Sequence, residues 1–279
     1  MRAYEKLYRV RRLLRGVSEG AAPVVRGSGV PYLSAAVAGL FPPGVVAAEL
    51  HGPAEEGALS LDEARSCERF TGKRVADFAA GRVCARRVLK ELGYAHVPLL
   101  IGVDRRPLWP SGIVGSISHT DGFCAVVAAR SHDYLSIGVD AEIVGRVGED
   151  LWTNLFTPAE LTLLRARPAA ERATRASIVF SAKEAFYKCQ FAITQQWLEF
   201  GDARLELHTS DMLGGTFVVL ADDATLALGR TTSAPLRGRF RVDGNLVLTG
   251  IVLRHETDPA PSEPGRSAKA APARSRSKR

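Results

Sequence analysis

The stretch S-I-G-V-D-A-E, residues 136–142, combines the pattern of a buried strand with two acidic side chains. Apolar Ile137 and Val139 predict a β-strand, and alternate residues of a strand point to the same face. Asp140 and Glu142 are therefore expected to lie side by side. Two neighbouring carboxylates repel each other unless a positive group lies between them. The stretch thus raises the question of which cation lies there.

Strand and helix patterns occur on both sides of this stretch. Before it, the sequence predicts strands at 45–50, 99–103 and 122–130. One helix is expected to begin at the capping box Ser60-Leu-Asp-Glu63, and a second helix to run from about 72 to 92. Pro107, Pro110 and Gly112 predict an irregular loop, and we also expect His119 in a loop. After it, the sequence predicts a helix from the capping box Thr157-Pro-Ala-Glu160, a long helix at about 170–191, and strands at 204–208, 216–220, 238–242 and 246–254.

This order of elements predicts an α+β fold class with two similar α/β subdomains. The strand that carries the two acids begins near Tyr134, which places the joint there. We expect a basic, flexible extension at 1–30, a first subdomain at 31–133 and a second at 134–255. The segment 256–279 lacks large apolar residues and is predicted to be a disordered basic tail.

The positive charge of the chain lies at its two ends. The formal net charge is +7, of which residues 1–16 carry +5 and residues 265–279 carry +6, so the rest of the chain sums to −4. A nucleic-acid-binding domain usually carries its own basic face. We therefore expect no nucleic-acid partner.

The cysteines and the apolar runs indicate a protein of the cytoplasm. The four cysteines are widely spaced and form no C-x-x-C pair, which disfavours zinc and a disulfide framework and fits a reducing compartment. No apolar run approaches the roughly 20 residues that span a bilayer. We expect no membrane partner and a cytoplasmic location.

Three further features carry polar groups that could meet the two acids. Glu184 and Lys188 are four residues apart within F-S-A-K-E-A-F-Y-K, residues 180–188, and share one face of the long helix. His119 ends the stretch Ser116-Ile-Ser-His119. Arg74, Arg82 and Arg86 recur along one helix face, which is either solvated or a phosphate clamp. Each feature alone has an ordinary structural explanation.

Together these residues predict chemistry on a phosphorylated small molecule. Carboxylate ligands without a Cys or His cluster select a hard cation, most plausibly Mg²⁺. Magnesium commonly bridges protein carboxylates and substrate phosphates. The cation between Asp140 and Glu142 is therefore expected to be a metal that holds a diphosphate.

The ordered motifs resemble the 4′-phosphopantetheinyl transferase superfamily. S-I-S-H-T at 116–120, G-V-D-A-E at 138–142 and F-S-A-K-E-A-F-Y-K at 180–188 carry the resemblance. It is supported by K-R-V-A-D-F-A-A-G-R-V-C-A-R at 73–86, W-P-S-G-I-V-G-S at 109–116 and W-L-E-F at 197–200. The resemblance covers roughly 31–255 and is closest to the group that activates enterobactin-type peptide synthetases and mycobacterial polyketide synthases.

This resemblance implies two similar α/β halves in a pseudo-twofold arrangement. It implies transfer of the 4′-phosphopantetheine arm from coenzyme A to a serine of an apo acyl or peptidyl carrier protein, with release of 3′,5′-ADP. The partners are then coenzyme A and carrier domains, and two fused halves favour a monomer.

The resemblance also implies roles for residues that match the motifs. Asp140, Glu142 and Glu184 would bind Mg²⁺. Lys188 would stabilise the transferring phosphate or protonate the leaving group, and either Glu184 or a metal-bound water would activate the serine. The predicted coenzyme A contacts are Arg74, Arg82, Arg105, Ser118, His119, Lys183 and Lys188. Some relatives have a lysine where this chain has Val103-Asp-Arg-Arg-Pro107, so Arg105 or Arg106 would take its place.

Other interpretations stay open at this point. A Mg²⁺-dependent nuclease or phosphodiesterase also gathers acids and lysine, although Glu142 is followed by Ile143 and Val144 and not by an acid-x-Lys motif. A nucleic-acid-binding protein could use the basic ends. Phe191 and Trp197 would line a pantetheine channel or belong to the core. A basic face is formed by Arg165, Arg167, Arg172 and Arg175. It is either a docking surface for a carrier domain or an ordinary solvated helix face.

Overall fold

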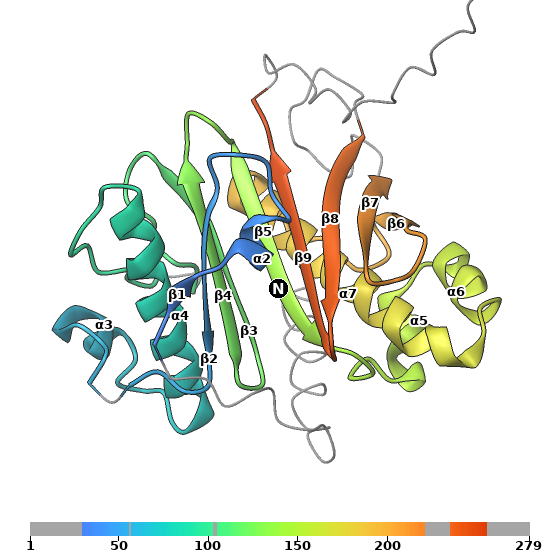
Figure 1. The fold of residues 1–279 in the computed structure, drawn as a ribbon, viewed down its shortest axis with the longest axis horizontal. Coiled ribbons are helices and arrows are strands. Elements are labelled where there is room, and N and C mark those ends of the chain that lie inside the picture. The colour runs from blue at the N-terminus through green and yellow to red at the C-terminus, as the bar shows by residue number, and fades with distance from the viewer. Residues whose placement is uncertain (1–29, 56, 103–104, 221–234, 256–279) are drawn as a thin grey trace, which may run out of the picture.

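A computed structural model of the chain describes residues 30–55, 57–102, 105–220 and 235–255. The described chain forms two antiparallel sheets that lie side by side, each with one long helix packed against it (Figure 1). The predicted extension at 1–30 lies outside the described residues except for Val30, and the predicted tail at 256–279 lies outside them entirely. Among the residues that the structure describes, no helix combines the length and apolar character needed to span a lipid bilayer.

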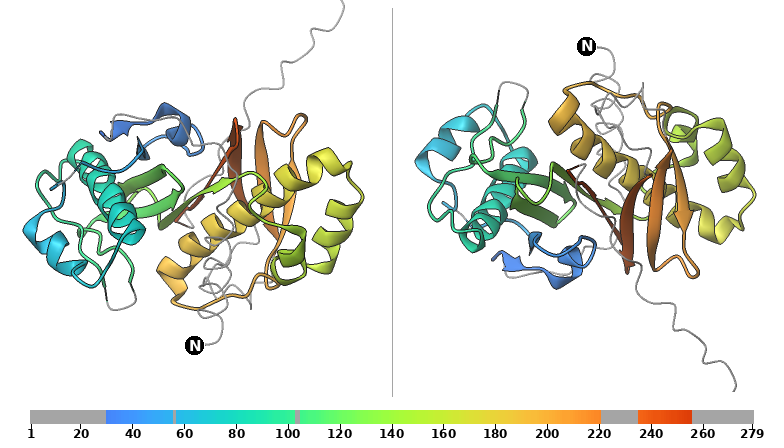
Figure 2. Two further views of the ribbon diagram at one scale, coloured as in Figure 1. Left: turned by 90° about the horizontal axis from the view of Figure 1, so that it is seen from below. Right: turned by 90° about the horizontal axis from the view of Figure 1, so that it is seen from above.

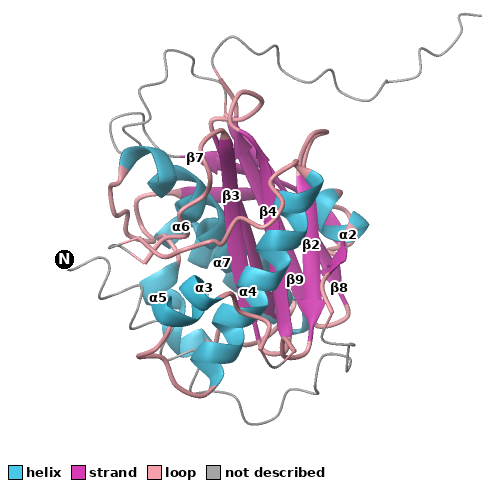
Figure 3. Cartoon of the chain, turned by 90° about the vertical axis from the view of Figure 1, so that its left-hand side faces the viewer, coloured by secondary structure: helices cyan, strands magenta, loops and turns pink. Residues whose placement is uncertain are grey.

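The first half contains a four-stranded sheet in the order β1-β2-β4-β3. Its strands are β1 (Tyr32–Leu33), β2 (Val46–His51), β3 (Ile113–Thr120) and β4 (Phe123–Arg130). Its helices are α2 (Ala35–Ala38), α3 (Leu61–Ser66) and α4 (Lys73–Glu91). Helix α4 crosses the sheet (Figure 3) and buries its apolar residues against β2 and β4.

The second half contains a five-stranded sheet in the order β5-β9-β8-β7-β6. Its strands are β5 (Ser136–Ile143), β6 (Arg204–His208), β7 (Gly214–Leu220), β8 (Leu236–Asp243) and β9 (Leu246–Leu253). Its helical elements are η1 (Glu149–Leu151), α5 (Trp152–Leu155), α6 (Pro158–Arg165) and α7 (Ala169–Thr194). Helix α7 packs on β5 and β9, and α2 lies on the opposite side of the sheets (Figure 2).

Two serines join the halves where β3 runs beside β5. The backbone N–H of Val139 donates to Ser116 Oγ at 3.1 Å, and that of Ala141 donates to Ser118 Oγ at 3.2 Å. The hydroxyls therefore occupy the place that backbone carbonyls take within a sheet. The S-I-S part of the motif thus fixes the position of β5 relative to the first half.

The two halves repeat the same structural device around a capping-box glutamate. Glu63 and Glu160 each close the capping box of a short helix. Each is also buried and accepts a hydrogen bond from a distant backbone N–H, that of Leu99 at 3.1 Å and that of Leu205 at 2.7 Å respectively. Each then pairs with a cation on the long helix, Glu63 with Arg86 on α4 and Glu160 with Lys183 on α7.

Most predicted elements are confirmed, and two predictions about the segment before β4 are wrong. The described part of 99–103 contains only an isolated bridge between Ile101 and Pro107. His119, which was expected in a loop, lies in strand β3 (Ile113–Thr120), which pairs with β4 along its whole length. Gly115 and the two serines hide the strand pattern. Gly115 is required because a Cβ there would lie 2.5 Å from the ring of Trp109.

Candidate active site

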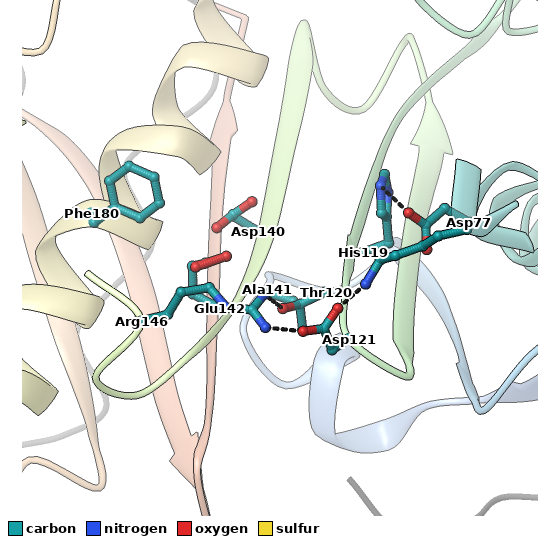
Figure 4. Close-up of a pocket in the computed structure, with 10 residues that line it drawn as sticks. Asp77, His119, Thr120, Asp121, Asp140, Ala141, Glu142, Arg146 and Phe180 are labelled. Carbon is teal, nitrogen blue, oxygen red and sulfur yellow. Dashed lines mark hydrogen bonds and ion pairs between the residues drawn. The ribbon is translucent and has the colours of Figure 1, made fainter. Parts of the chain in front are cut away.

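A cleft between the two halves contains the two acids of β5 (Figure 4). Its lining comes from α4, the end of β3, the β3–β4 turn, β5, the loop after β5 and α7. The lining residues are Lys73, Asp77, His119, Thr120, Asp121, Asp140, Ala141, Glu142, Arg146 and Phe180. The cleft therefore requires both halves of the chain.

Asp140 is buried and held by three side-chain donors. It is 3% exposed. Its Oδ1 accepts a hydrogen bond from Ser118 Oγ at 2.8 Å and from Lys188 Nζ at 2.6 Å, and its Oδ2 accepts one from Ser181 Oγ at 2.9 Å. Lys188 also donates to the carbonyl oxygen of Val139 at 2.9 Å. The ammonium of Lys188 is thus a cation next to Asp140 in this structure.

The other two predicted acids come from two elements. Glu142 follows Asp140 on β5, and Glu184 belongs to α7, which packs on β5. Figure 4 shows the carboxylates of Asp140 and Glu142 on the same side of β5, as the alternation of the strand predicts. Glu184 is on α7 and is 2% exposed. Glu142 Oε2 and Glu184 Oε1 are buried oxygens that accept no hydrogen bond, although both residues have further interactions.

The three carboxylates do not form a finished metal site. In the described ranges, no three His, Cys, Asp or Glu side chains are arranged to hold a metal ion together. Glu184 is also absent from the described lining of the cleft. Asp140 Oδ1 is bound to the ammonium of Lys188, which is the charge that a metal at this carboxylate would compete with.

Two separate sets of polar contacts lie beside the acids in the cleft. His119 Nε2 lies 3.4 Å from Asp77 Oδ2. Asp121 pairs with both Lys73 and Arg146. These contacts connect α4, the β3–β4 turn and the loop after β5. Sequence analysis assigned no role to Lys73, Asp77, Asp121 or Arg146, although Lys73 and Asp77 stand four apart in a motif that carries the family resemblance.

Arg146 makes a hydrogen bond in addition to its ion pair with Asp121. Its Nη1 donates to Thr120 Oγ1 at 2.9 Å. Neighbouring charges of opposite sign reduce each other's cost of burial. The positive groups at this end of the cleft are therefore already held in place by acids.

The arginine ladder of α4 has three separate structural environments. Arg82 is buried, donates from Nε to the Leu99 carbonyl at 2.8 Å and lies 3.9 Å over the Phe78 ring. Its burial lowers the pKa of Arg82 to about 10, against the opposing effect of Glu63. The three arginines therefore do not face one common site in this structure.

The other two arginines of the ladder also have partners of their own. Arg86 pairs with Glu63 and donates to the Ala58 carbonyl. Arg74 is exposed and lies 3.8 Å over the Phe70 ring. Of the three, only Arg74 presents its guanidinium mainly to solvent.

Lys183 is fully buried against α6 and does not reach the cleft. It is 0% exposed. Its Nζ donates to Glu160 Oε2 at 2.8 Å and to the carbonyls of Leu155 at 3.2 Å and Phe200 at 2.6 Å. Burial lowers the pKa of Lys183, an effect that Glu160 partly offsets. The three donors of the ammonium are thus all used inside the protein, and this position does not support the predicted phosphate contact.

The remaining predicted residues lie outside the described lining of the cleft. Ser118 is 4% exposed and bonds to Asp140, so it positions this carboxylate. Arg105 is exposed and has a φ of +66°, whereas the guanidinium of Arg106 lies 5.4 Å from the Phe191 ring on α7. Phe191 in turn packs on Trp197, with ring centroids 4.2 Å apart.

The fold and this site define an α+β protein of two halves with a charged cleft between them. Carboxylates, Lys73, His119 and Arg146 line this cleft, and basic groups of this kind are the ones that bind phosphates. Comparison with family models gives two matches. The 4′-phosphopantetheinyl transferase N-terminal domain matches residues 62–129, and the 4′-phosphopantetheinyl transferase superfamily matches residues 136–227.

Three relatives agree with these matches. The chain is 40% identical over 197 residues to 4′-phosphopantetheinyl transferase PptT of Mycobacterium tuberculosis, covering 69% of this chain and 85% of that protein. It is 33% identical over 223 residues to 4′-phosphopantetheinyl transferase Svp of Streptomyces mobaraensis, covering 78% and 89%. It is 35% identical over 136 residues to enterobactin synthase component D of Escherichia coli, covering 48% and 63%. The chain belongs to the 4′-phosphopantetheinyl transferase superfamily, which confirms the resemblance seen in its motifs.

Proposed function

We propose that the protein transfers the 4′-phosphopantetheine arm of coenzyme A to a serine of an apo acyl or peptidyl carrier protein, releasing 3′,5′-ADP. The observation that carries the proposal is the partly buried contact of Lys188 with Asp140, which lines the cleft between the halves together with Glu142. The contact brings together motifs that are 48 residues apart in the chain. Family membership supports the same reaction.

The acids fit a hard divalent cation by the chemistry of their donors. Asp140, Glu142 and Glu184 offer only oxygen ligands, which Mg²⁺ prefers. The ammonium beside Asp140 shows that this carboxylate accommodates a positive charge. These three residues would hold Mg²⁺, which when bound would neutralise charge on the diphosphate of coenzyme A.

The chain's own basic residues would bind and polarise the phosphates. Lys188, with 21% of its side chain exposed, is the best-placed donor for the phosphoryl group that is transferred. His119 lines the cleft from β3, and Arg74 is exposed on α4, one residue after the lining residue Lys73. We assign both to the phosphates of coenzyme A. Lys183 and Arg82 are left out because each is buried in other contacts.

Two assignments remain alternatives within the proposal. Either Arg105 or Arg106 contacts coenzyme A, and the position of Arg106 over Phe191 favours a place near the pantetheine arm. Either Glu184 or a metal-bound water accepts the proton of the carrier serine. The buried position of Glu184, on the same helix as Lys188, favours Glu184 as the group that accepts this proton.

The same proposal includes a carrier-protein partner, a location and an oligomeric state. Carrier domains are typically acidic, and the exposed Arg165 and Arg167 offer a basic edge. Arg172 donates to the carbonyls of these two residues at 2.9 and 2.8 Å, which fixes the edge to the end of α6. We propose a cytoplasmic monomer, since the described cleft is built within one chain.

Intact-mass spectrometry tests the proposed reaction. The full chain is incubated with an apo carrier protein, coenzyme A and Mg²⁺, with EDTA added to a matched sample. A mass gain equal to one phosphopantetheine arm, lost with EDTA, is expected. Absence of the gain with acyl, peptidyl and polyketide carriers would refute the function, and hydrolysis of a phosphodiester substrate would then favour the nuclease alternative.

A further inference from the structure

The carboxylate of Asp140 is held by hydroxyl groups from both halves of the protein. Ser118 comes from β3 and Ser181 from α7, and both are buried. A third hydroxyl lies behind Ser181. Thr249 is opposite Asp140 in the β5–β9 register, is 0% exposed, and has its Oγ1 2.9 Å from Ser181 Oγ.

We propose that Ser181 and Thr249 are positioning residues that hold Asp140 in the orientation needed to bind the cation. The proposal rests on the proposed function, because it assigns Asp140 to the metal. Neither residue lines the described cleft or reaches the reacting groups. Both act through Asp140.

The number of hydroxyl hydrogens determines how this network works. Three contacts are present: Ser181 to Asp140, Ser181 to Thr249, and Thr249 Oγ1 to the Ser181 carbonyl at 2.9 Å. Two hydroxyls supply only two hydrogens. The charged carboxylate takes that of Ser181, because charge-assisted hydrogen bonds are the stronger ones. Thr249 donates its own hydrogen to the Ser181 backbone carbonyl, and its Oγ1 lies against the Ser181 hydroxyl, so Thr249 holds Ser181 in place and Ser181 holds Asp140.

The other oxygen of Asp140 also accepts a hydrogen bond from a buried serine. The Ala141 N–H donates to Ser118 Oγ, and Ser118 donates to Asp140 Oδ1. Lys188 binds this same oxygen. With Oδ2 released, the carboxylate could rotate and give both oxygens to the ammonium. Ser181 therefore prevents a closer pairing with Lys188 that would compete with the metal.

The packing of α7 on β5 places Ser181 where this role requires it. A Cβ on Gly138 would lie 2.0 Å from the Ala185 carbonyl oxygen, so only glycine lets the helix lie this close. Ser181 is one helical turn before Ala185, and Asp140 is two residues after Gly138. The short serine side chain fits the narrow space between them.

Manganese binding to the full chain tests the proposal without measuring turnover. Mn²⁺ replaces Mg²⁺ as a spectroscopic probe, and its binding is followed by electron paramagnetic resonance in the absence of coenzyme A. Ser181→Ala is expected to weaken Mn²⁺ binding by about 10–100-fold, the usual effect of losing a group that orients a metal ligand. Thr249→Val removes only a hydroxyl and should weaken binding by less. Ser181→Thr keeps the hydroxyl and should restore binding.

Ser177→Ala is the matched control on the same helix. Ser177 is also 0% exposed, but it donates to the Ala173 carbonyl and accepts from the Gly145 N–H, away from Asp140. It should change thermal stability without changing Mn²⁺ binding. If Ser181→Ala fails to fold, Thr249→Val decides the question.

The outcomes separate this proposal from the proposed function. Folded variants of Ser181 and Thr249 that bind Mn²⁺ as the unaltered protein does would overturn the positioning role, and so would absence of Mn²⁺ binding by the unaltered protein. Weakened binding in the variants supports the role even if no carrier is modified. In that case only the transfer reaction is refuted.

Discussion

Lys183→Met gives the sharpest test of whether Lys183 is structural or binds phosphate. In the structure its ammonium lies between Glu160 and two backbone carbonyls and is fully buried. Methionine has a similar length but no charge. The substitution leaves the Glu160 carboxylate, which is 3% exposed, without its counter-ion.

The cost can be worked out from this geometry. Removing one partner of a buried ion pair typically destabilises a protein by about 3–5 kcal/mol. Glu160 keeps hydrogen bonds from the N–H groups of Thr157 and Leu205, which places the cost at about the lower end of that range. With a denaturant slope of about 3 kcal/mol per molar urea, we expect the unfolding midpoint to fall by about 1 M.

Urea unfolding and coenzyme A binding are measured on the same preparations. Lys90→Met changes an exposed lysine of α4 and controls for loss of a charge. Adding Glu160→Gln to Lys183→Met should recover part of the stability, because the uncompensated charge is removed. Below the unfolding transition, folded Lys183→Met should bind coenzyme A normally. An unchanged midpoint together with weak coenzyme A binding would refute the structural role and restore the phosphate contact.

Three further predictions concern the acids and the chain ends. Glu184→Gln should abolish carrier modification in the mass assay while the thermal unfolding curve stays cooperative, whereas normal turnover would exclude Glu184 as base and ligand. Although burial alone would raise it, the hydrogen bonds from Ser60 and Leu99 and the charge of Arg86 lower the pKa of Glu63. The stabilisation by Glu63 should therefore be complete above its unfolded pKa of about 4.3 and be lost as the pH falls through the lower folded value. The urea midpoints of the unaltered chain and Glu63→Gln should accordingly differ most near neutral pH and converge in acid, and a gap that does not change with pH would contradict this. Removing 1–29 and 256–279 should leave transfer intact, and a loss of activity would assign the ends a role in catalysis or carrier binding.

Local patterns predicted the elements whose stability depends on nearby residues. Both capping boxes are confirmed, because each involves side chains and backbone N–H groups within three residues of one another. The hairpin at Asp243-Gly244 is confirmed for the same reason. Strand β3 was missed because its serines bond to β5 in the other half, and no local pattern shows that partner.

The spacing of charged residues predicted which side chains share a helix face, but not what that face meets. Arg82 and Arg86 share a face with Arg74, yet they hold Leu99 and Glu63 inside the first half. Lys183 and Lys188 stand five apart on α7 and have opposite fates, one buried under α6 and one beside Asp140. Burial by a distant segment decides between these fates.

The sequence by itself determined the two-part α/β organisation, the family, and the residue types of the acidic site. These follow from periodicity, caps and short ordered motifs, which act over a few residues. The tertiary structure alone decided that Ser118 and Ser181 hold Asp140 from opposite halves, with Lys188 as its counter-ion. Such contacts join segments up to 48 residues apart. They depend on how α7 and β3 pack against β5, because a hydrogen bond requires atoms to meet within about 3 Å.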